Sequence, residues 1–243
     1  MELGELSGYL KGTYAGRHWE KLGVRRRAGI LFPLFSIRTS ENMGMGEYPD
    51  LNLLVDWCVL TGHSVIQLLP TNDTGVNNFP YSALSAFALN PAFLSLQKMD
   101  GAPSGASAHL ENSAQTNGTR FQFLRILEKK IRLFETLFTS FQKTASSKLK
   151  AEFRDFTSKN SFWLHDYSTF MALKEIHRWR PWEEWRSKYS KRNKRAMKLF
   201  SEFHSTRVVF FFFLKNGPLL FFSKFWVNTS QLIKIKKKKK YSI

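Results

Sequence analysis

One strand, loop, helix and strand pattern constrains the fold of this chain more than any other feature. Two short apolar runs, Ala28 to Phe35 (AGILFPLF) and Ser64 to Pro70 (SVIQLLP), are typical of strands buried on both faces. Between them lie a Gly-rich loop at residues 42–50 and apolar residues at helical spacing over residues 51–59, with Gly62 as a stop signal. This order predicts a βαβ unit with two parallel strands, and therefore an α/β fold.

The loop after the second predicted strand is the first place to look for a site. In α/β proteins, the loops at the C-terminal ends of parallel strands carry the chemistry. The loop from Thr71 to Pro91 is dense in hydroxyl and amide side chains and contains the aromatic residues Phe79 and Phe87. Sugar-binding sites combine such hydrogen-bonding groups with an aromatic platform. The same polar residues are common in turns, so composition alone leaves a plain connecting loop open.

The amino-acid sequences of these segments are more specific than their composition. The series AGILFPLFSIR, GMGEYPDLNLLVDWC, SVIQLLPTNDTG and PYSALSAFALNP resembles the 4-alpha-glucanotransferase family, the amylomaltases or disproportionating enzymes. The resemblance resumes at FTSKNSFWLHDYSTFMALKEIHRWRPWEEW and so runs from Ala28 to Trp185. It implies a partial, interrupted (β/α)8 barrel of the TIM type with a helical insertion over about residues 101–185. The implied reaction belongs to carbohydrate metabolism and moves α-1,4-glucan segments between malto-oligosaccharides.

The resemblance also implies substrate-binding residues. Tyr81 and Ser82 match the Pro-Tyr-Ser segment of the family, whose tyrosine lies in the glucan-binding cleft, and Asn78 is the next candidate. Phe79 stands where bacterial relatives usually have serine. The implied partner is a malto-oligosaccharide or an α-1,4-glucan, and the reaction requires no cofactor.

Catalytic residues are not assigned in this chain. Retaining glycosyl transfer needs two carboxyl groups about 5 to 5.5 Å apart. The family's catalytic carboxylates lie in motifs on later barrel strands that have no counterpart here, so we expect the chain to be inactive alone. Helix faces, caps and turns are the expected roles of the available carboxylates Asp56, Asp73, Asp166, Glu175, Glu183 and Glu184. The alternative function is a non-catalytic glucan-binding or interaction protein.

Other classes of function have no support in the sequence. The six histidines form no HExxH pair and there is a single cysteine, so neither a metal site nor a disulfide framework is expected. The glycines at residues 44–46 lack the spacing of a P-loop or a dinucleotide-binding loop. The N-terminal residues lack the pattern of a signal peptide, and together with the single cysteine this predicts a cytoplasmic protein.

Two helical segments are expected after the variable stretch that follows the loop. The spacing of apolar residues from Phe121 to Phe138 predicts a long amphipathic helix, and we expect its basic face to be solvated. That face consists of Arg125, Lys129, Lys130 and Arg132. Residues 162–176 show a mostly apolar helix face, with Asp166 expected at a helix start. The tryptophans that follow, Trp179, Trp182 and Trp185, either pack or offer stacking platforms for sugars.

The last 37 residues differ in composition from the rest. Residues 207–243 contain nine basic residues and no acid, which is half of the net charge of +18, together with runs of phenylalanine and lysine. We therefore expect an N-terminal extension at residues 1–27, a barrel portion at residues 28–206, and a low-complexity tail at residues 207–243 outside the native fold. We expect no nucleic-acid partner and no membrane partner. An anion-binding role for the basic tail or for residues 188–195 remains an alternative.

Overall fold

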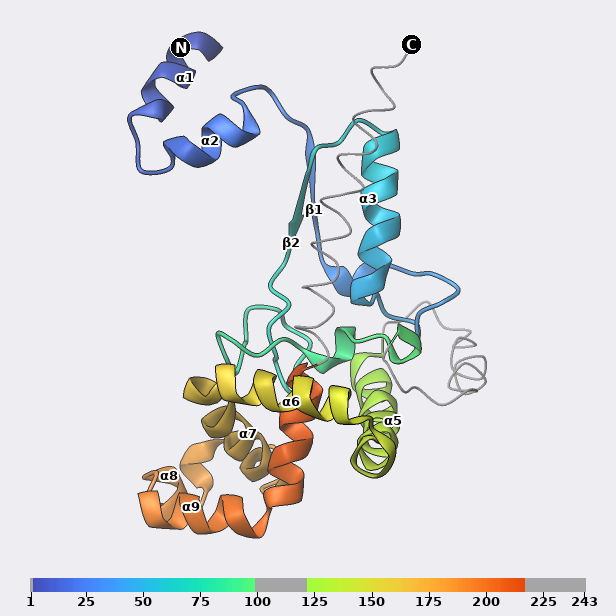
Figure 1. Ribbon diagram of the computed structural model, residues 1–243, viewed down its shortest axis with the longest axis vertical. Coiled ribbons are helices and arrows are strands. Elements are labelled where there is room, and N and C mark those ends of the chain that lie inside the picture. The colour runs from blue at the N-terminus through green and yellow to red at the C-terminus, as the bar shows by residue number, and fades with distance from the viewer. Residues whose placement is uncertain (1, 99–121, 217–243) are drawn as a thin grey trace.

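The computed structural model describes residues 2–98 and 122–216 of the 243-residue chain (Figure 1). This part is mostly helical, with a small two-stranded parallel sheet. The strands are β1 (Gly29–Phe32) and β2 (Val65–Leu68). The named helices are α1 (Leu3–Lys11), α2 (Gly16–Leu22), α3 (Leu51–Leu60), α5 (Phe123–Thr144), α6 (Ser147–Lys159), α7 (Ser161–Ile176), α8 (Ser187–Ser190) and α9 (Lys194–Phe203). Residues 205–216 are helical as well.

The sheet confirms the predicted βαβ unit. β1 pairs with β2 in parallel, in a register that runs from Gly29 opposite Val65 to Phe32 opposite Leu68. The crossover passes through a 3-10 turn at Tyr48–Asp50 and then through α3, which lies alongside the strands in Figure 1. Both strands point their C-terminal ends toward the helical part of the molecule.

The prediction that both strands are buried on two faces is wrong. In β1 and in β2, exposed side chains alternate with partly buried ones, and Leu31 is 64% exposed. The reason is that α3 packs along one face of the pair, whereas the side chains of the other face are exposed within the described residues. An apolar strand sequence predicts what could be buried, and neighbouring elements decide whether it is.

The Gly-rich loop between β1 and α3 is tightly built. The Asp50 carboxylate accepts hydrogen bonds from the Asn42 side-chain amide (2.9 Å) and from the backbone N–H of Glu47 (2.7 Å). Tyr48 and Met45 from this loop are fully buried. A Cβ on Gly46 would lie 1.9 Å from a backbone carbonyl oxygen, so this position requires glycine.

The helices that follow pack into one core below the sheet. The predicted amphipathic helix is confirmed as α5, which buries Phe123, Leu127, Phe134, Leu137 and Phe138 on one face. α6 packs on α7 and α7 packs on α9. In α7 the apolar face is buried as expected, but the helix begins at Ser161 rather than near Asp166. Asp166 therefore lies inside the helix, where it forms an exposed ion pair with Arg192.

Lys130 corrects the expectation of a solvated basic face on α5. Its side chain is fully buried, and its ammonium donates to Glu47 (2.7 Å) and to the carbonyl oxygens of Ala92 (2.6 Å) and Leu94 (2.9 Å). All three donors of the ammonium are satisfied, which is the condition for placing a lysine in a core. Burial nevertheless lowers the pKa of Lys130, with the Glu47 charge acting in the opposite direction.

Residues 207–216 differ from the expected tail. They are helical, and Val208, Phe210, Phe213 and Leu214 are buried in the same core as α5 and α7. The phenylalanine run lies in a helix, so several of its rings face α5, including Phe210 and Phe213 against Phe138. Residues 217–243 lie outside the described part, and the expectation for them stays a prediction.

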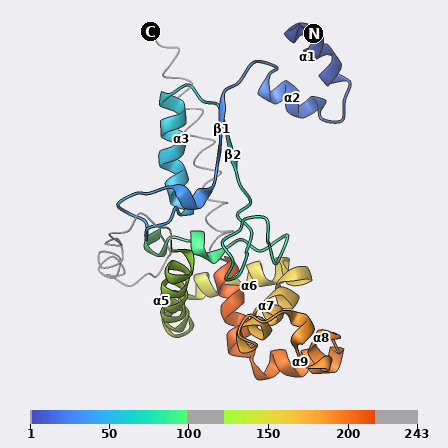
Figure 2. The same cartoon turned by 180° about the vertical axis from the view of Figure 1, so that it is seen from behind.

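The first two helices stand apart from this core. α1 and α2 contact each other, and α1 buries none of its residues. Figures 1 and 2 show the pair beyond the N-terminal ends of the strands, at the opposite end of the sheet from helices α5 to α9. This position keeps residues 2–22 away from the loop that follows β2.

Candidate functional site

The loop that leaves β2 crosses the end of the sheet and returns next to its own start. An isolated antiparallel bridge pairs Asn72 with Leu89 and closes the loop at its base. The Asn72 side-chain amide donates to the carbonyl oxygens of Ser85 (3.2 Å) and Ala86 (3.0 Å). The loop is irregular, so side chains rather than a sheet ladder form hydrogen bonds with many of its backbone groups.

Asp73 is the centre of this base. Its backbone N–H donates to Ala88 (2.8 Å) and its carbonyl accepts from Leu84 (2.7 Å). One carboxylate oxygen accepts from the backbone N–H of Gly75 (2.8 Å). Its main chain and one side-chain oxygen therefore hold three separate points of the loop together.

The other carboxylate oxygen of Asp73 has two buried partners from distant helices. Lys215 contacts it at 2.5 Å from the last described helix, and the Tyr167 hydroxyl donates to it from α7. Lys215 is 1% exposed and Asp73 is 2% exposed. Burial lowers the pKa of Lys215, against the opposing effect of the Asp73 charge, and burial together with that charge raises the pKa of Tyr167.

A second set of polar contacts fixes the return arm of the loop. The side-chain amide of Asn90 donates to the Thr74 hydroxyl (3.1 Å), and its carbonyl oxygen accepts from the backbone N–H of Ala92 (2.9 Å). The Thr74 hydroxyl in turn donates to the carbonyl oxygen of Asn77. Asn90 and Thr74 are both buried, so these hydrogen bonds are shielded from water.

Gly75 lets the loop approach the helical part closely. Its φ is +61°, and a Cβ there would lie 2.5 Å from the ring of Trp179. Trp179 also has a positive φ, of 62°, and Lys174 donates to its carbonyl oxygen (3.4 Å). Trp179 therefore packs beneath the loop, and Trp185 is buried in the core, whereas Trp182 is half exposed.

The predicted substrate-binding residues lie at the exposed tip of this loop. Tyr81 is 65% exposed and Phe79 is 56% exposed, with ring centroids 5.6 Å apart and planes inclined by 58°. A turn closed by the Ser82 N–H donating to the Phe79 carbonyl oxygen (3.0 Å) places these rings side by side. Ser82 and Asn78 are exposed, so their side chains face solvent beside the two rings.

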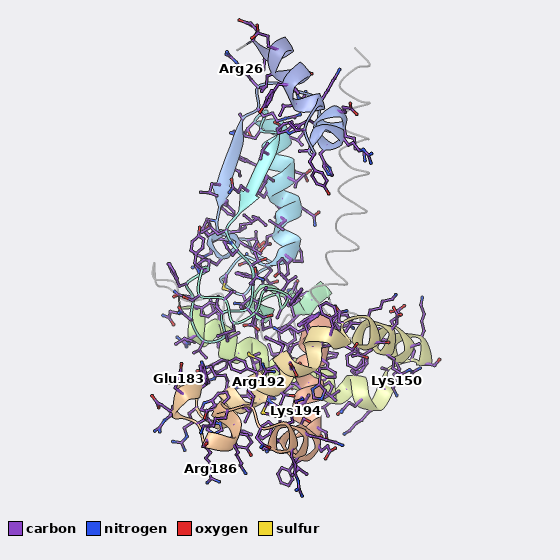
Figure 3. The ribbon with its side chains drawn as sticks, turned by 90° about the vertical axis from the view of Figure 1, so that its left-hand side faces the viewer. Arg26, Lys150, Glu183, Arg186, Arg192 and Lys194 are labelled. Atoms are coloured by element: carbon purple, nitrogen blue, oxygen red, sulfur yellow. The ribbon has the colours of Figure 1, made fainter. Side chains whose placement is uncertain are left out.

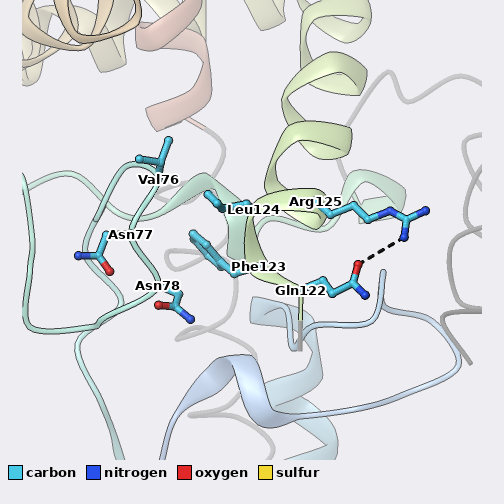
Figure 4. Close-up of a pocket in the computed structure, with 7 residues that line it drawn as sticks. All are labelled: Val76, Asn77, Asn78, Gln122, Phe123, Leu124 and Arg125. Carbon is cyan, nitrogen blue, oxygen red and sulfur yellow. Dashed lines mark hydrogen bonds between the residues drawn. The ribbon is translucent and has the colours of Figure 1, made fainter. Parts of the chain in front are cut away.

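An open hollow of about 610 Å³ lies next to the tip. Figure 4 shows Asn77 and Asn78 facing Gln122 and Phe123 at the start of α5 across this space. Its full lining is Val76, Asn77, Asn78, Gln122, Phe123, Leu124 and Arg125. The structure thus brings Asn78 to this hollow, while Tyr81 and Ser82 lie outside its lining.

The other carboxylates named from the sequence are elsewhere. Glu175 is bound by Arg207, which also reaches Glu135 (2.6 Å). Asp56 lies on an exposed part of α3, and Asp166 pairs with Arg192. Figure 3 shows Glu183 on the surface of the helical part, near Arg186 and far from the strands. None of these side chains belongs to the loop at the end of β2.

Sequence reasoning missed Lys215 and Tyr167 as structural partners of the loop, and it missed Lys130 as a buried residue. The sequence pattern puts Tyr167 on an apolar helix face and Lys215 in a low-complexity tail. The available signal was the helical spacing of Val208, Phe211 and Lys215, which puts the lysine on an apolar face.

The geometry suits recognition of a polyhydroxylated ring. Two exposed aromatic rings offer apolar faces, and exposed hydroxyl and amide groups surround them. Across residues 2–98 and 122–216 there is no group of three or more His, Cys, Asp or Glu side chains arranged to hold a metal ion. Among the helices of the same two ranges, none combines the length and apolar character that a membrane crossing requires.

Two solved structures share the fold of this chain. The amylomaltase of Streptococcus agalactiae, solved with acarbose, superposes with a TM-score of 0.69 at 21% identity, over 84% of this chain and 40% of that enzyme. The amylomaltase of Corynebacterium glutamicum gives a TM-score of 0.64 at 15% identity, over 86% of this chain and 28% of the other. The described fold therefore matches part of the amylomaltases, which are TIM-barrel enzymes.

Sequence relationships then identify the family. The family profile of the 4-alpha-glucanotransferases, glycoside hydrolase family 77, matches residues 32–231. The 4-alpha-glucanotransferase of Chlamydia pneumoniae is 37% identical over 171 residues, which cover 68% of this chain and 32% of that enzyme. The 4-alpha-glucanotransferase DPE2 of Oryza sativa is 36% identical over 159 residues, or 62% of this chain and 16% of the relative.

This chain belongs to the 4-alpha-glucanotransferase family, and the predicted resemblance is confirmed. It spans about a third of the length of the chlamydial relative that it matches. The family match also extends beyond residue 206 into the helix that carries Lys215.

Proposed function

We propose that this chain carries the glucan-binding part of a 4-alpha-glucanotransferase, an enzyme that moves α-1,4-glucan segments between malto-oligosaccharides. We infer that β1, α3 and β2 form one unit of an interrupted (β/α)8 barrel. Helices α5 to α7 then belong to the helical insertion. In this arrangement the loop after β2 lies at the face where barrel enzymes bind their substrates.

The observation that carries this proposal is the exposed Phe79 and Tyr81 pair at the tip of a loop with a rigid, buried base. The two rings form a contiguous exposed aromatic patch, and such a patch marks a binding surface. A glucose unit presents C–H groups on its faces and hydroxyls at its edge. Tyr81 is proposed to stack on the ring face, with Ser82 and Asn78 as hydrogen-bonding partners of the hydroxyls.

The second candidate function is glucan binding without transfer. The buried carboxylates Glu47, Asp50 and Asp73 in the described residues all take part in hydrogen bonds or ion pairs with the protein. They are therefore unsuited to act as a nucleophile and an acid on a bound sugar, which requires two accessible carboxyl groups about 5 to 5.5 Å apart. We propose that the chain alone binds glucan and does not transfer it.

Titration calorimetry with maltoheptaose tests the binding. We expect measurable affinity that falls about tenfold in Tyr81→Ala, because loss of a stacking ring costs on the order of 1 kcal/mol or slightly more. Tyr14→Ala removes a fully exposed tyrosine from the segment between α1 and α2 and serves as the control. Equal affinities of the unmodified chain and Tyr81→Ala would remove the support for this site.

A disproportionation assay with maltotriose separates the two candidates. Glucan binding without glucose release is the result expected for the isolated chain. Glucose release that Tyr81→Ala reduces would show instead that the chain is a competent transferase. Either result is interpretable because the same preparation is first tested for binding.

A further inference from the structure

We propose that Lys215 and Tyr167 are positioning residues for the glucan-binding loop and act on Tyr81 through Asp73. This role rests on the proposed function of the loop. It goes beyond that function because it states that residues from two helices, distant in sequence, hold the loop in its position. Lys215 is 142 residues from Asp73, and Tyr167 is 94 residues from it. Neither residue touches the exposed tip of the loop.

Asp73 controls several points of the loop. Its backbone and one carboxylate oxygen bind Gly75, Leu84 and Ala88, which lie before and after the tip that carries Tyr81. A displacement of Asp73 would therefore move both arms of the loop. The tip has little packing of its own, because its two rings and Ser82 face solvent.

Lys215 and Tyr167 in turn fix Asp73. Both bind the same carboxylate oxygen, and the ammonium of Lys215 also donates to the carbonyl oxygen of Leu89 (2.9 Å) on the return arm. The ammonium lies 5.0 Å from the ring centroid of Tyr167, so the lysine is enclosed on that side by an aromatic ring. Lys215 thus joins the outgoing and returning arms of the loop at one buried point.

The buried contact between Lys215 and Asp73 constrains geometry more than it stabilises the fold. A buried ion pair stabilises a fold no more than apolar residues of the same volume, and often less, but it favours one geometry of its partners. Removing one partner leaves the other charge unpaired in apolar surroundings, and the loop must then shift to let water reach it. The ion pair between Lys215 and Asp73 therefore determines the position of the loop, whereas the apolar residues determine whether the core forms.

A second buried ion pair provides a matched control. Lys130 and Glu47 form a contact of 2.7 Å with side-chain exposures of 0% and 5%, close to those of Lys215 and Asp73. The carbonyl oxygens that Lys130 binds belong to Ala92 and Leu94, beyond the end of the loop. Lys130→Met therefore reproduces the loss of a buried lysine without breaking a contact of Asp73.

The test measures the maltoheptaose dissociation constant of the full chain and its variants by calorimetry, at a temperature where each variant is folded. Lys215→Met is expected to weaken binding about tenfold, or about 1.4 kcal/mol, and Tyr167→Phe about threefold. Lys130→Met is expected to stay within about twofold of the unmodified chain. In a Tyr81→Ala background, Lys215→Met should cause a smaller loss than in the unmodified chain, because a large part of its effect acts through Tyr81.

Hydrogen exchange gives the corresponding structural readout. Peptides covering residues 72–91 should exchange faster in Tyr167→Phe, which keeps the aromatic ring in place, and should be unchanged in Lys130→Met. If Lys215→Met does not fold, Tyr167→Phe alone decides the question. Unchanged glucan affinity and loop exchange in Tyr167→Phe would overturn the positioning role, as would equal weakening by Lys130→Met or additive losses with Tyr81→Ala.

The failure of this proposal is distinguishable from that of the proposed function. If the unmodified chain binds maltoheptaose and Tyr81→Ala weakens it, the function holds whatever the Lys215 variants do. If the unmodified chain does not bind, the function and the positioning role both fail.

Discussion

At the scale of single residues, the buried phenol of Tyr48 makes the stability of this fold depend on pH in the alkaline range. The Tyr48 side chain is fully buried, and its hydroxyl donates to the carbonyl oxygen of Thr71 (3.5 Å). Burial raises the pKa of Tyr48 above its ordinary value of 10.0. The stability that this residue contributes is therefore complete below pH 10 and is lost as the pH rises above it, because the unfolded chain releases the proton first.

We expect Tyr48→Phe to reduce the alkaline loss of stability. One such tyrosine contributes a slope of up to about 1.4 kcal/mol per pH unit in the window above its ordinary pKa. The measurement is the free energy of unfolding in urea at about pH 9 and about pH 11. Tyr14→Phe changes an exposed tyrosine and should keep the original slope. Identical pH dependence in Tyr48→Phe and the unmodified chain would contradict the prediction.

At the scale of elements, the helix at residues 205–216 is held by rings and by one arginine. Phe210 is 2% exposed and lies against Phe138, with ring centroids 5.6 Å apart. The Arg207 guanidinium lies over the Phe210 ring, 4.3 Å from its centroid. Hydrogen bonds from Arg207 to Glu175 and Glu135 join this helix to α7 and α5. The packing of its rings and the hydrogen bonds of Arg207 therefore both hold this helix in the core.

Phe210→Ala should destabilise the chain by about 3 to 5 kcal/mol, because it leaves a cavity among packed rings. Phe212→Ala, at a partly buried position in the same run, should cost clearly less. Urea unfolding followed by circular dichroism compares the two variants directly. Similar costs for both would mean that the run does not pack as a helix with one buried face.

The elements themselves were largely predictable from the sequence, whereas their partners were not. Residues 51–60 and 123–144 have an apolar period that indicates helices, and the two apolar runs indicate strands, because these signals are local. Lys130 and Lys215 were not predictable as buried residues, since their carboxylate partners lie 83 and 142 positions away. The loop tip around Tyr81 was identified by resemblance, and its buried support by structure.

At the scale of the whole molecule, the sheet offers apolar side chains to solvent within the described part. Leu31 on β1 is 64% exposed and Val65 on β2 is 43% exposed. Trp57 and Leu60 on the neighbouring α3 are exposed as well. Each strand has one hydrogen-bonded neighbour among the described residues, so its other edge presents unpaired backbone groups there. Exposed apolar strands with unpaired edges associate with other chains.

We therefore expect the chain to self-associate with increasing concentration, and Leu31→Lys to reduce this association. A lysine on an exposed strand opposes edge-to-edge pairing by its charge and its hydration. Leu199→Lys is the matched control, because Leu199 is 56% exposed on α9, away from the sheet. Light scattering coupled to size-exclusion chromatography measures the mass over a concentration series. If Leu31→Lys and Leu199→Lys reduce the mass equally, net charge rather than the sheet governs association, because the two variants differ only in where the charge is placed.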